Sequence, residues 1–502
     1  MADFNIMNPA DLDTLLFNPF QQAIGETEHQ RLQTQYRNYL YYDGYQHKGA
    51  SDELVKAEDV PRPQGLDYDP TRFVSNYARL LVSKKAKWQM SGAQGIDVIT
   101  RRLGEETSEV QQAEYARADA LEAIITQLRR ENNAKSRLIQ AARDRLIAGR
   151  VAVKILFNPT NGRLKWVWHP DTETFPVYSE DDFEDLIACH FVREKTIDGA
   201  LFYQKQTFEM IDGECWLSEG LYDEALKLKR TITPKASMGI TFLPVVLVPI
   251  EDLAGEAAMS KEFDDIRTLS AILNQMNEDA IDSLKFEMFG ITVIKNATPG
   301  TASKLDIAPG AVIEMNGSGD APVDAMRLEG GFRWNEAHKA VIERTKATMY
   351  ELTSLPQSAI GDLNFGGMNN DAMRIVFHDI IQDTEEHWLT WGPKLVELHE
   401  KSIRYLQARS ATAKTFAYDK QALALIGDNY EHEIKFSLPL PDNRADLIDL
   451  LALEMASGLE SQLGALSRAG VENTAAKREE IAQDVKRMQT AQDPYGEADN
   501  EV

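Results

Sequence analysis

Two long amphipathic segments separated by a short insert constrain the fold of this chain more than any other feature. In the first segment, residues 256–288, apolar side chains recur in steps of three and four and draw one continuous stripe. The stripe consists of Met259, Phe263, Ile266, Leu269, Leu273, Met276, Ala280, Leu284 and Met288. At 1.5 Å per residue this helix would be roughly 50 Å long, more than a small domain needs.

The insert, Phe289 to Gly331, has the composition of a small β-rich module. It contains the strand-like runs FGITVIK and GAVIEM, with proline and several glycines between them. A second helix is expected over Trp334–Leu352, where the apolar period continues through His338, Val341, Thr345, Met349 and Leu352. Two helices that leave a body, carry a module and return make a stalk, which is common in assemblies and uncommon in compact enzymes.

A loop rich in glycine and asparagine follows the second helix, which Pro356 ends. Its residues are Asp362, Leu363, Asn364, Phe365, Gly366, Gly367, Met368, Asn369 and Asn370. No local segment can bury its apolar side chains, and the two glycines let its backbone change shape at low cost. A new helix is expected to start at Asn370 as its N-cap, with Asp371 in its first turn.

The order of these segments, preceded by a strand in LPVVLVPI, resembles that of the portal proteins of tailed double-stranded DNA phages. Those proteins form the ring through which the genome is pumped into the capsid. The resemblance is one of architecture and a few loose motifs. It covers residues 36–487 and is most specific between Phe242 and Phe377.

The remaining segments are similar to the same family. Tyr36–Ala50 reads as a helix ending in a Tyr-Asp-Gly turn, and Arg72–Gly92 as an amphipathic helix that carries Asn76. Glu109–Gly149 reads as one long helical stretch. Six strands are then expected in VAVKILFN, RLKWVWHP, TFPVYS, DLIACHFVRE, ALFYQKQTFEMI and ECWLSE. The turn Asn158–Gly162 predicts a hairpin between the first two.

The resemblance implies an α+β portal fold that is mainly helical, with a β-meander in its wing. The implied parts are a wing (1–255), a first stem helix (256–288), a small α/β clip (289–333), a second stem helix (334–355), a tunnel loop (356–370), a kinked long wing helix with the wing return (371–440), a helical crown (441–489) and a disordered tail (490–502). Within the crown, breaks are expected at Gly458 and Gly470.

The length and composition of the chain limit the classes of protein to which it can belong. A length of 502 residues is enough for about three domains. No run of eighteen apolar residues exists, and the first thirty residues lack the order of a signal peptide. Cys189 and Cys215 are the only cysteines, so neither a disulfide framework nor a cysteine zinc site is expected. A reducing, cytosolic place of assembly and no membrane partner fit these observations.

The charge is strongly negative. Asp and Glu outnumber Lys and Arg by 79 to 54, which gives a formal net charge of −25. A protein that grips DNA by its phosphates needs the opposite sign. A conduit does not, because like charges repel within a Debye length of about 8 Å and a mostly acidic wall resists sticking.

The first long helix could supply such a wall. The channel-lining candidates are Glu262, Asp265, Glu278, Asp279 and Asp282, with Asp264 and Glu287 on the same helix. The alternative is that these residues form only the solvated face of an exposed helix.

The basic residues considered for DNA contact are concentrated in a few segments. They are Lys84, Lys85, Lys87, Arg129, Arg130, Arg137, Arg143, Arg145 and Arg150. They could contact DNA that passes near the wing, or they could be solvated helix faces and salt bridges between subunits.

Enzyme motifs are missing. The sequence contains no G-x-x-x-x-G-K-[ST], no G-x-S-x-G and no H-E-x-x-H, so we expect no catalysis, no cofactor and no metal. The pair Trp388 and Trp391 beside Gly392-Pro393 is expected to fill a helix kink. Two alternatives to a portal remain at this point: another oligomeric head–tail adaptor or scaffold, and a metal-dependent nuclease built from the many carboxylates.

The resemblance also implies an activity and partners. A homododecameric ring would occupy one capsid vertex of the virion after assembly in the host cytoplasm, and double-stranded DNA would pass through it without sequence recognition. The clip would dock the terminase and later the head-completion or adaptor proteins, while the wing would meet the major capsid and scaffold proteins. The tunnel loops would touch DNA, and a separate ATPase would supply the energy.

Overall fold

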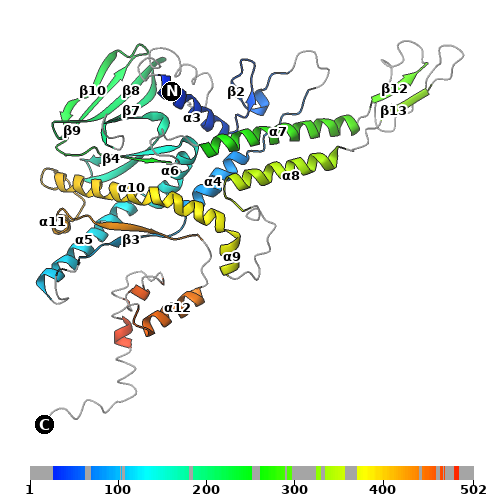
Figure 1. Cartoon of the computed structure of the whole chain (residues 1–502). Helices are drawn as coiled ribbons and strands as arrows, with labels where there is room; N and C mark the ends of the chain where they lie inside the picture. Colours follow the sequence, from blue (N-terminus) through cyan, green and yellow to red (C-terminus); the bar gives the residue numbers. More distant parts are fainter. Residues whose placement is uncertain are drawn as a thin grey trace, which may run out of the picture. The chain divides into compact units, whose positions relative to one another are not determined.

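The structure is a computed structural model of the chain, and it shows a mixed α+β protein (Figure 1). The described residues are 26–62, 69–101, 103, 108–179, 185–250, 261–288, 291–296, 324–328, 334–356, 370–439, 444–459, 464–466, 469, 477 and 480–484. The chain divides into two compact units, residues 1–363 with 377–438, and residues 364–376 with 439–502. Each unit is described by itself.

A three-stranded antiparallel sheet contributes much of the core of the first unit. β4 (Arg150–Asn158) lies between β11 (Val245–Pro249) and β5 (Arg163–Pro170). The consecutive side chains of Val151, Ala152 and Val153 in β4 are all fully buried, and because neighbouring residues point to opposite faces, this strand is covered on both. The predicted hairpin between β4 and β5 is confirmed.

A five-stranded antiparallel sheet follows in the order β10-β9-β8-β7-β6. Its strands are β6 (Thr174–Tyr178), β7 (Leu186–Ile197), β8 (Ala200–Ile211), β9 (Glu214–Tyr222) and β10 (Leu228–Ser237). The sequence predicts four of them. It misses β10, which is an edge strand with a proline and is exposed along nearly its whole length, so it lacks the alternating apolar pattern.

Two N-terminal helices pack against the body. α3 (Glu26–Tyr42) ends in the predicted Tyr-Asp-Gly turn, where Gly44 has a φ of 98°. A short hairpin, β1 (His47–Lys48) with β2 (Leu54–Val55), and the 3-10 turn η1 (Ala57–Asp59) follow. α4 (Tyr77–Met90) starts later than the expected Arg72, because Asn76 caps it: the Asn76 side chain accepts a hydrogen bond from the backbone N–H of Arg79.

The single helical stretch expected over Glu109–Gly149 is wrong in one respect, because the structure has two helices there. α5 (Glu109–Glu131) and α6 (Ala134–Ala148) are separated at Asn132 and Asn133. Asn133 has a left-handed backbone with a φ of 49°. The Asn132 carboxamide accepts a hydrogen bond from Trp166 N at 2.8 Å and donates to Leu164 O at 3.3 Å, so contacts with β5 hold the break in place.

A long helix, α10 (His378–Ser410), crosses the first unit (Figure 1). The expected packing of its tryptophans is confirmed: Trp391 is fully buried, and Trp388 stacks on Phe436 with ring centroids 5.0 Å apart. After α11 (Lys420–Ile426) the chain forms β14 (His432–Phe436), which pairs with β3 (Gln94–Val98).

Two helices of the first unit run side by side and correspond to the two long helices expected from the sequence. They are α7 (Lys261–Met288) and α8 (Asn335–Leu352) (Figure 1). Between them in the chain, β12 (Ile291–Lys295) pairs antiparallel with β13 (Asp324–Leu328). β12 lies in the predicted FGITVIK run, whereas GAVIEM falls outside the described residues.

The second unit contains α9 (Asn370–Val376) and α12 (Arg444–Ala456). A helix therefore starts at Asn370 as expected, but it ends at Val376, and α10 begins separately at His378. The predicted break at Gly458 is confirmed: its φ is 73°, and the N–H of Leu459 donates to Glu454 O at 3.0 Å, as in a Schellman motif. Gly470 and residues 485–502 lie outside the described part.

Two histidines in contact give the first unit an acid-sensitive point. His399 of α10 and His432 of β14 are both buried, and His399 Nδ1 lies 3.0 Å from His432 Nε2. His432 Nδ1 donates to Tyr430 O at 2.7 Å, so its Nε2 is the acceptor in the pair. Burial lowers both pKa values, and that of His399 is lowered further by the neighbouring His432 and Arg129.

We expect this pair to make stability fall in acid. Unfolded histidines take up protons near pH 6.5, while the buried pair stays neutral to lower pH, so the unfolded state binds more protons below that value. Each histidine then costs about 1.4 kcal/mol of unfolding free energy per pH unit. The unfolding free energy, measured by urea unfolding, should fall between pH 7 and pH 5. This fall should be smaller in the double variant His399→Leu with His432→Leu than in the wild type. His378 is exposed, so His378→Gln should lose as much unfolding free energy as the wild type. An equal loss in the wild type, the double variant and His378→Gln would show that the buried pair is not the cause.

Candidate functional site at the base of the helix pair

The base of the α7–α8 pair is packed into the body, and its far part is not. On α7, Phe263, Ile266 and Leu273 are at most 1% exposed, whereas Leu284 is 42% exposed. On α8, Met349 is fully buried and Val341 is 47% exposed. The predicted stripe of α7 therefore forms core at one end only, and on α8 Met349 is buried while Leu352, the last residue of the stripe, is 45% exposed.

An extended segment, residues 69–76, lies along one face of α7. The N–H groups of Thr71, Phe73 and Ser75 donate to side chains of α7 at 3.0, 2.8 and 2.9 Å. Their acceptors are Asp282, Glu278 and Asn274, so the two segments run antiparallel. We call this set of contacts the ladder.

The ladder works because two periods nearly agree. Four residues of helix rise about 6 Å, and two residues of extended chain span about 6.6 Å, so every second N–H meets every fourth side chain. The ladder also satisfies backbone donors that would otherwise lack partners in a segment without a sheet neighbour. It explains why residues 72–76 are not part of α4.

Further side chains close around the ladder. Glu278, which is 7% exposed, also contacts His47 Nε2 and Arg72 Nη1, and Asn274 Nδ2 donates to Gln46 Oε1 at 2.7 Å. Burial would raise the pKa of Asp282, but hydrogen bonds from Thr71 and Lys285 lower it below its ordinary value. Asp282 is therefore a stable acceptor near neutral pH.

A buried lysine joins α7 to two other helices. Lys85 of α4 is 2% exposed, and its ammonium lies 2.8 Å from Glu262 of α7 and 2.8 Å from Asp383 of α10. Burial opposes the charge of Lys85, but the two carboxylates outweigh it and raise its pKa. We call these three residues the Lys85 triad.

The five channel-lining candidates fall into two groups. Glu262 belongs to the Lys85 triad, and Glu278 and Asp282 belong to the ladder. Asp265 and Asp279 are exposed, and with Ile272, which is 44% exposed, they recur every seven residues on one free face of α7. Whether any of them lines a channel stays a prediction.

Other predicted residues are placed as follows. Asn370 is the first residue of α9, and the rest of the glycine- and asparagine-rich loop, from Asp362 to Asn369, lies outside the described residues. Among the basic residues, Arg145 is 1% exposed, and Arg150 pairs with the buried Asp171 at 2.6 Å. With Lys85 in its triad, these three form contacts within the chain, while Lys87 and Arg137 are exposed.

Neither the ladder nor the Lys85 triad was predicted from the sequence. Asn274, Glu278 and Asp282 stand four residues apart, which is a polar stripe beside the apolar one and could have been noticed. Nothing in the sequence showed that its partner would be the backbone of residues 71–75. Lys85 looked like a solvated helix residue because its neighbours Lys84 and Lys87 are also basic.

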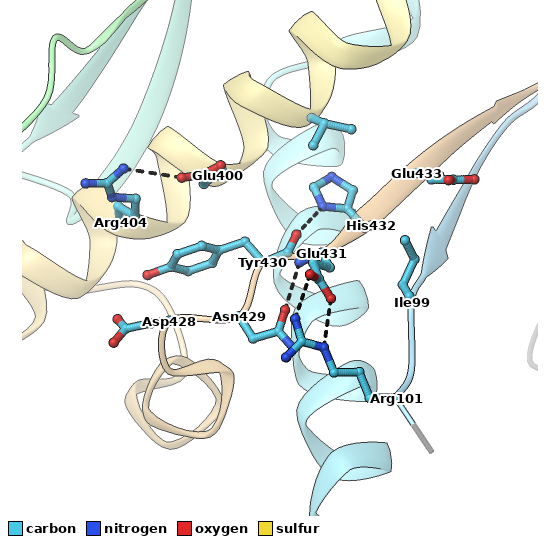
Figure 2. Close-up of a pocket in the computed structure, with 11 residues that line it drawn as sticks. Ile99, Arg101, Glu400, Arg404, Asp428, Asn429, Tyr430, Glu431, His432 and Glu433 are labelled. Atoms are coloured by element: carbon cyan, nitrogen blue, oxygen red, sulfur yellow. Dashed lines mark hydrogen bonds and ion pairs between the residues drawn. The ribbon is translucent and has the colours of Figure 1, made fainter. Parts of the chain in front are cut away.

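A wide polar hollow of about 970 Å³ lies between α10 and β14 (Figure 2). Four of its charged side chains form two pairs: Arg101 holds Glu431 with two hydrogen bonds, and Arg404 contacts Glu400 at 3.2 Å. Among the described residues no group of three or more His, Cys, Asp or Glu could hold a metal ion. In the same part of the chain no helix is long and apolar enough to cross a bilayer.

Removing the central acceptor of the ladder should release the extended segment. We expect Glu278→Ala to lower the unfolding free energy by about 2–3 kcal/mol, because it leaves the Phe73 N–H without its acceptor. In hydrogen exchange the Phe73 amide should exchange faster than in the wild type. Asp279→Ala removes the same charge from the next, exposed residue and should change neither measurement. Unchanged exchange at Phe73 in Glu278→Ala would show that the ladder is dispensable.

The Lys85 triad can be tested separately from the ladder. Lys85→Met should lower the unfolding free energy by about 3–5 kcal/mol, because two carboxylates stay behind without their cation. Adding Glu262→Gln and Asp383→Asn should recover part of that loss, as measured by urea unfolding. The exposed Lys87→Met should have little effect, and equal losses at positions 85 and 87 would argue against a triad.

The region that contains this site matches a family of known proteins. A protein-family model described as "Phage portal protein, SPP1 Gp6-like" matches residues 21–493 of the chain. The match includes the ladder, the Lys85 triad and both helices of the pair. No curated protein matches the chain.

Proposed function

The chain belongs to the SPP1 Gp6-like family of phage portal proteins, and from that membership we propose a role for each part of the molecule. Proteins of this family are structural components of an oligomeric ring at a capsid vertex, through which DNA is packaged and ejected, and they are not enzymes. Family membership decides against the adaptor and nuclease alternatives.

α7 and α8 are the stem, and the insert over residues 289–333 is the clip. The observation that carries this assignment is the antiparallel β12–β13 pair, which the chain enters three residues after α7 and leaves before α8. A small module connected to the far ends of two paired helices can present one surface to partners. The clip then docks the terminase and later the head-completion or adaptor proteins.

The stem lines the channel with the free face of α7. Asp265, Ile272 and Asp279 support this role because they are exposed on one face and have no part in the ladder or the triad. Carboxylates on that face repel phosphates and let the duplex slide. Glu262, Glu278 and Asp282 hold the base of the stem in place.

The remaining parts follow the family architecture. Residues 1–255 and 371–440 form the wing, which meets the major capsid and scaffold proteins, and residues 441–489 form the crown. Residues 356–370 form the tunnel loop, and its residues 362–370 touch the DNA in the channel. The ring is a homododecamer assembled in the host cytoplasm.

The tunnel loop can be tested without disturbing the ring. Gly366→Val with Gly367→Val should leave rings with a central hole in negative-stain micrographs, because the loop is not expected to hold subunits together. The length of DNA packaged or retained should fall, since valine closes backbone angles that glycine allows.

A matched control keeps the conformational freedom of the loop. Gly366→Asn with Gly367→Asn should package more DNA than the valine pair, because asparagine tolerates left-handed backbone angles. If intact valine rings package and retain DNA normally, the loop has no part in the mechanism. Failure of the wild-type chain to form rings would instead reject the proposed assembly.

A further inference from the structure

A pocket on the five-stranded sheet has no role in the functions proposed above. It has a volume of about 400 Å³ and lies where α3 approaches one face of β6–β9. Its walls are mostly apolar or aromatic and include Phe175, Val177, Val192, Tyr203 and Tyr222. Their strand register places these side chains on one face of the sheet, with Val192 opposite Lys205 and Tyr203 opposite Tyr222.

One cation faces this apolar pocket. Lys205 of β8 is half-buried, and burial lowers its pKa. Among the described residues no carboxylate lies within ion-pair distance of its ammonium. The nearby Glu209 is paired with Lys235 at 2.8 Å, and Glu28 at the pocket edge is held by Arg31 at 2.6 Å. A partly desolvated ammonium beside aromatic walls favours a ligand that carries both a carboxylate and an apolar side chain.

The chain itself carries a segment of that chemistry. Glu28 lies in the first turn of α3, so residues 1–25 join the structure next to the pocket. That stretch contains no lysine or arginine, and in ADLDTLLFNPF two aspartates, Asp11 and Asp13, precede a run of leucines and phenylalanines. Leu16 precedes Glu26 by ten residues, which can span up to about 35 Å, so the pocket is within reach.

We propose that the pocket binds the amino-terminal segment of a copy of this chain. An apolar side chain of residues 12–20 enters between Val192, Tyr203 and Tyr222, and Asp11 or Asp13 pairs with the Lys205 ammonium. The inference does not depend on the roles given to the stem, clip or tunnel loop. Its consequence is a tether on the sheet that fastens the amino terminus to the same subunit or to its neighbour in the ring.

Photo-cross-linking in the full-length protein tests this. Leu16→p-benzoylphenylalanine places a cross-linker in the segment, and after irradiation the linked peptides are identified by mass spectrometry. We expect links to peptides that contain Val192, Tyr203 or Tyr222. Mixing isotope-labelled and unlabelled copies tells links within one chain from links between copies, and both support the proposal.

Substitution of the lysine adds specificity to the test. Lys205→Glu should lower the yield of these links by about tenfold, as expected when a charge-assisted hydrogen bond is lost, and Lys205→Arg should keep it. Lys195→Glu makes the same charge change on β7, at an exposed position whose side chain points to the opposite face, and should leave the yield unchanged.

The proposal also has defined ways to fail. If Lys205→Glu does not fold, Lys205→Met removes the charge while keeping the apolar stem, and a similar loss of links is expected. Links confined to regions other than β6–β9 and α3 would overturn the proposal. So would an undiminished yield in a folded Lys205→Met or Lys205→Glu protein, because the cation would then have no part in binding.

Discussion

The burial of one ammonium group fixes how the projecting helix pair meets the rest of the molecule. A buried lysine is tolerated only where carboxylates offset its desolvation, and here the two carboxylates come from different helices. α4, α7 and α10 must therefore meet at Lys85 in one arrangement. A rotation of α7 by a single residue, about 100°, would carry Glu262 away from the ammonium and leave charges without partners.

The ladder fixes α7 in a second way, farther along its axis. Acceptors at Asn274, Glu278 and Asp282 hold an extended segment over two turns of the helix, so the tilt of α7 is set as well as its rotation. Beyond Asp282 this support ends, and Leu284 on α7 is 42% exposed. A helix pair that is rigid at its base and apolar at its far part suits a ring, where neighbouring copies cover what one chain leaves open.

An element of this fold could be predicted from the sequence where residues close together in the chain determine it, and not where distant contacts do. Helices α7 and α8 and strands β4 to β9 were predictable because the spacing of their apolar residues can be read from consecutive positions. The break between α5 and α6 was not, because it depends on hydrogen bonds between Asn132 and β5, far along the chain. The start of α4 was misjudged for a similar reason, since the N–H groups of Phe73 and Ser75 are held by α7. β10 was missed because an exposed edge strand needs no apolar face.

The environment of a charged residue is the feature that the sequence predicted least well. Two neighbouring acids on α7 show this, because one is buried and the other exposed. Glu278 is buried in the ladder and Asp279 is exposed, although they are adjacent in sequence and of the same charge. Successive residues of a helix point about 100° apart, so a net charge of −25 says nothing about which carboxylates reach a channel. Some acids of α7 bind backbone N–H groups or Lys85. These partners compensate much of the negative charge, so it acts only weakly on molecules outside the chain. Asp265 and Asp279 are exposed and belong to neither the ladder nor the Lys85 triad, so their charges act on whatever faces that side of α7.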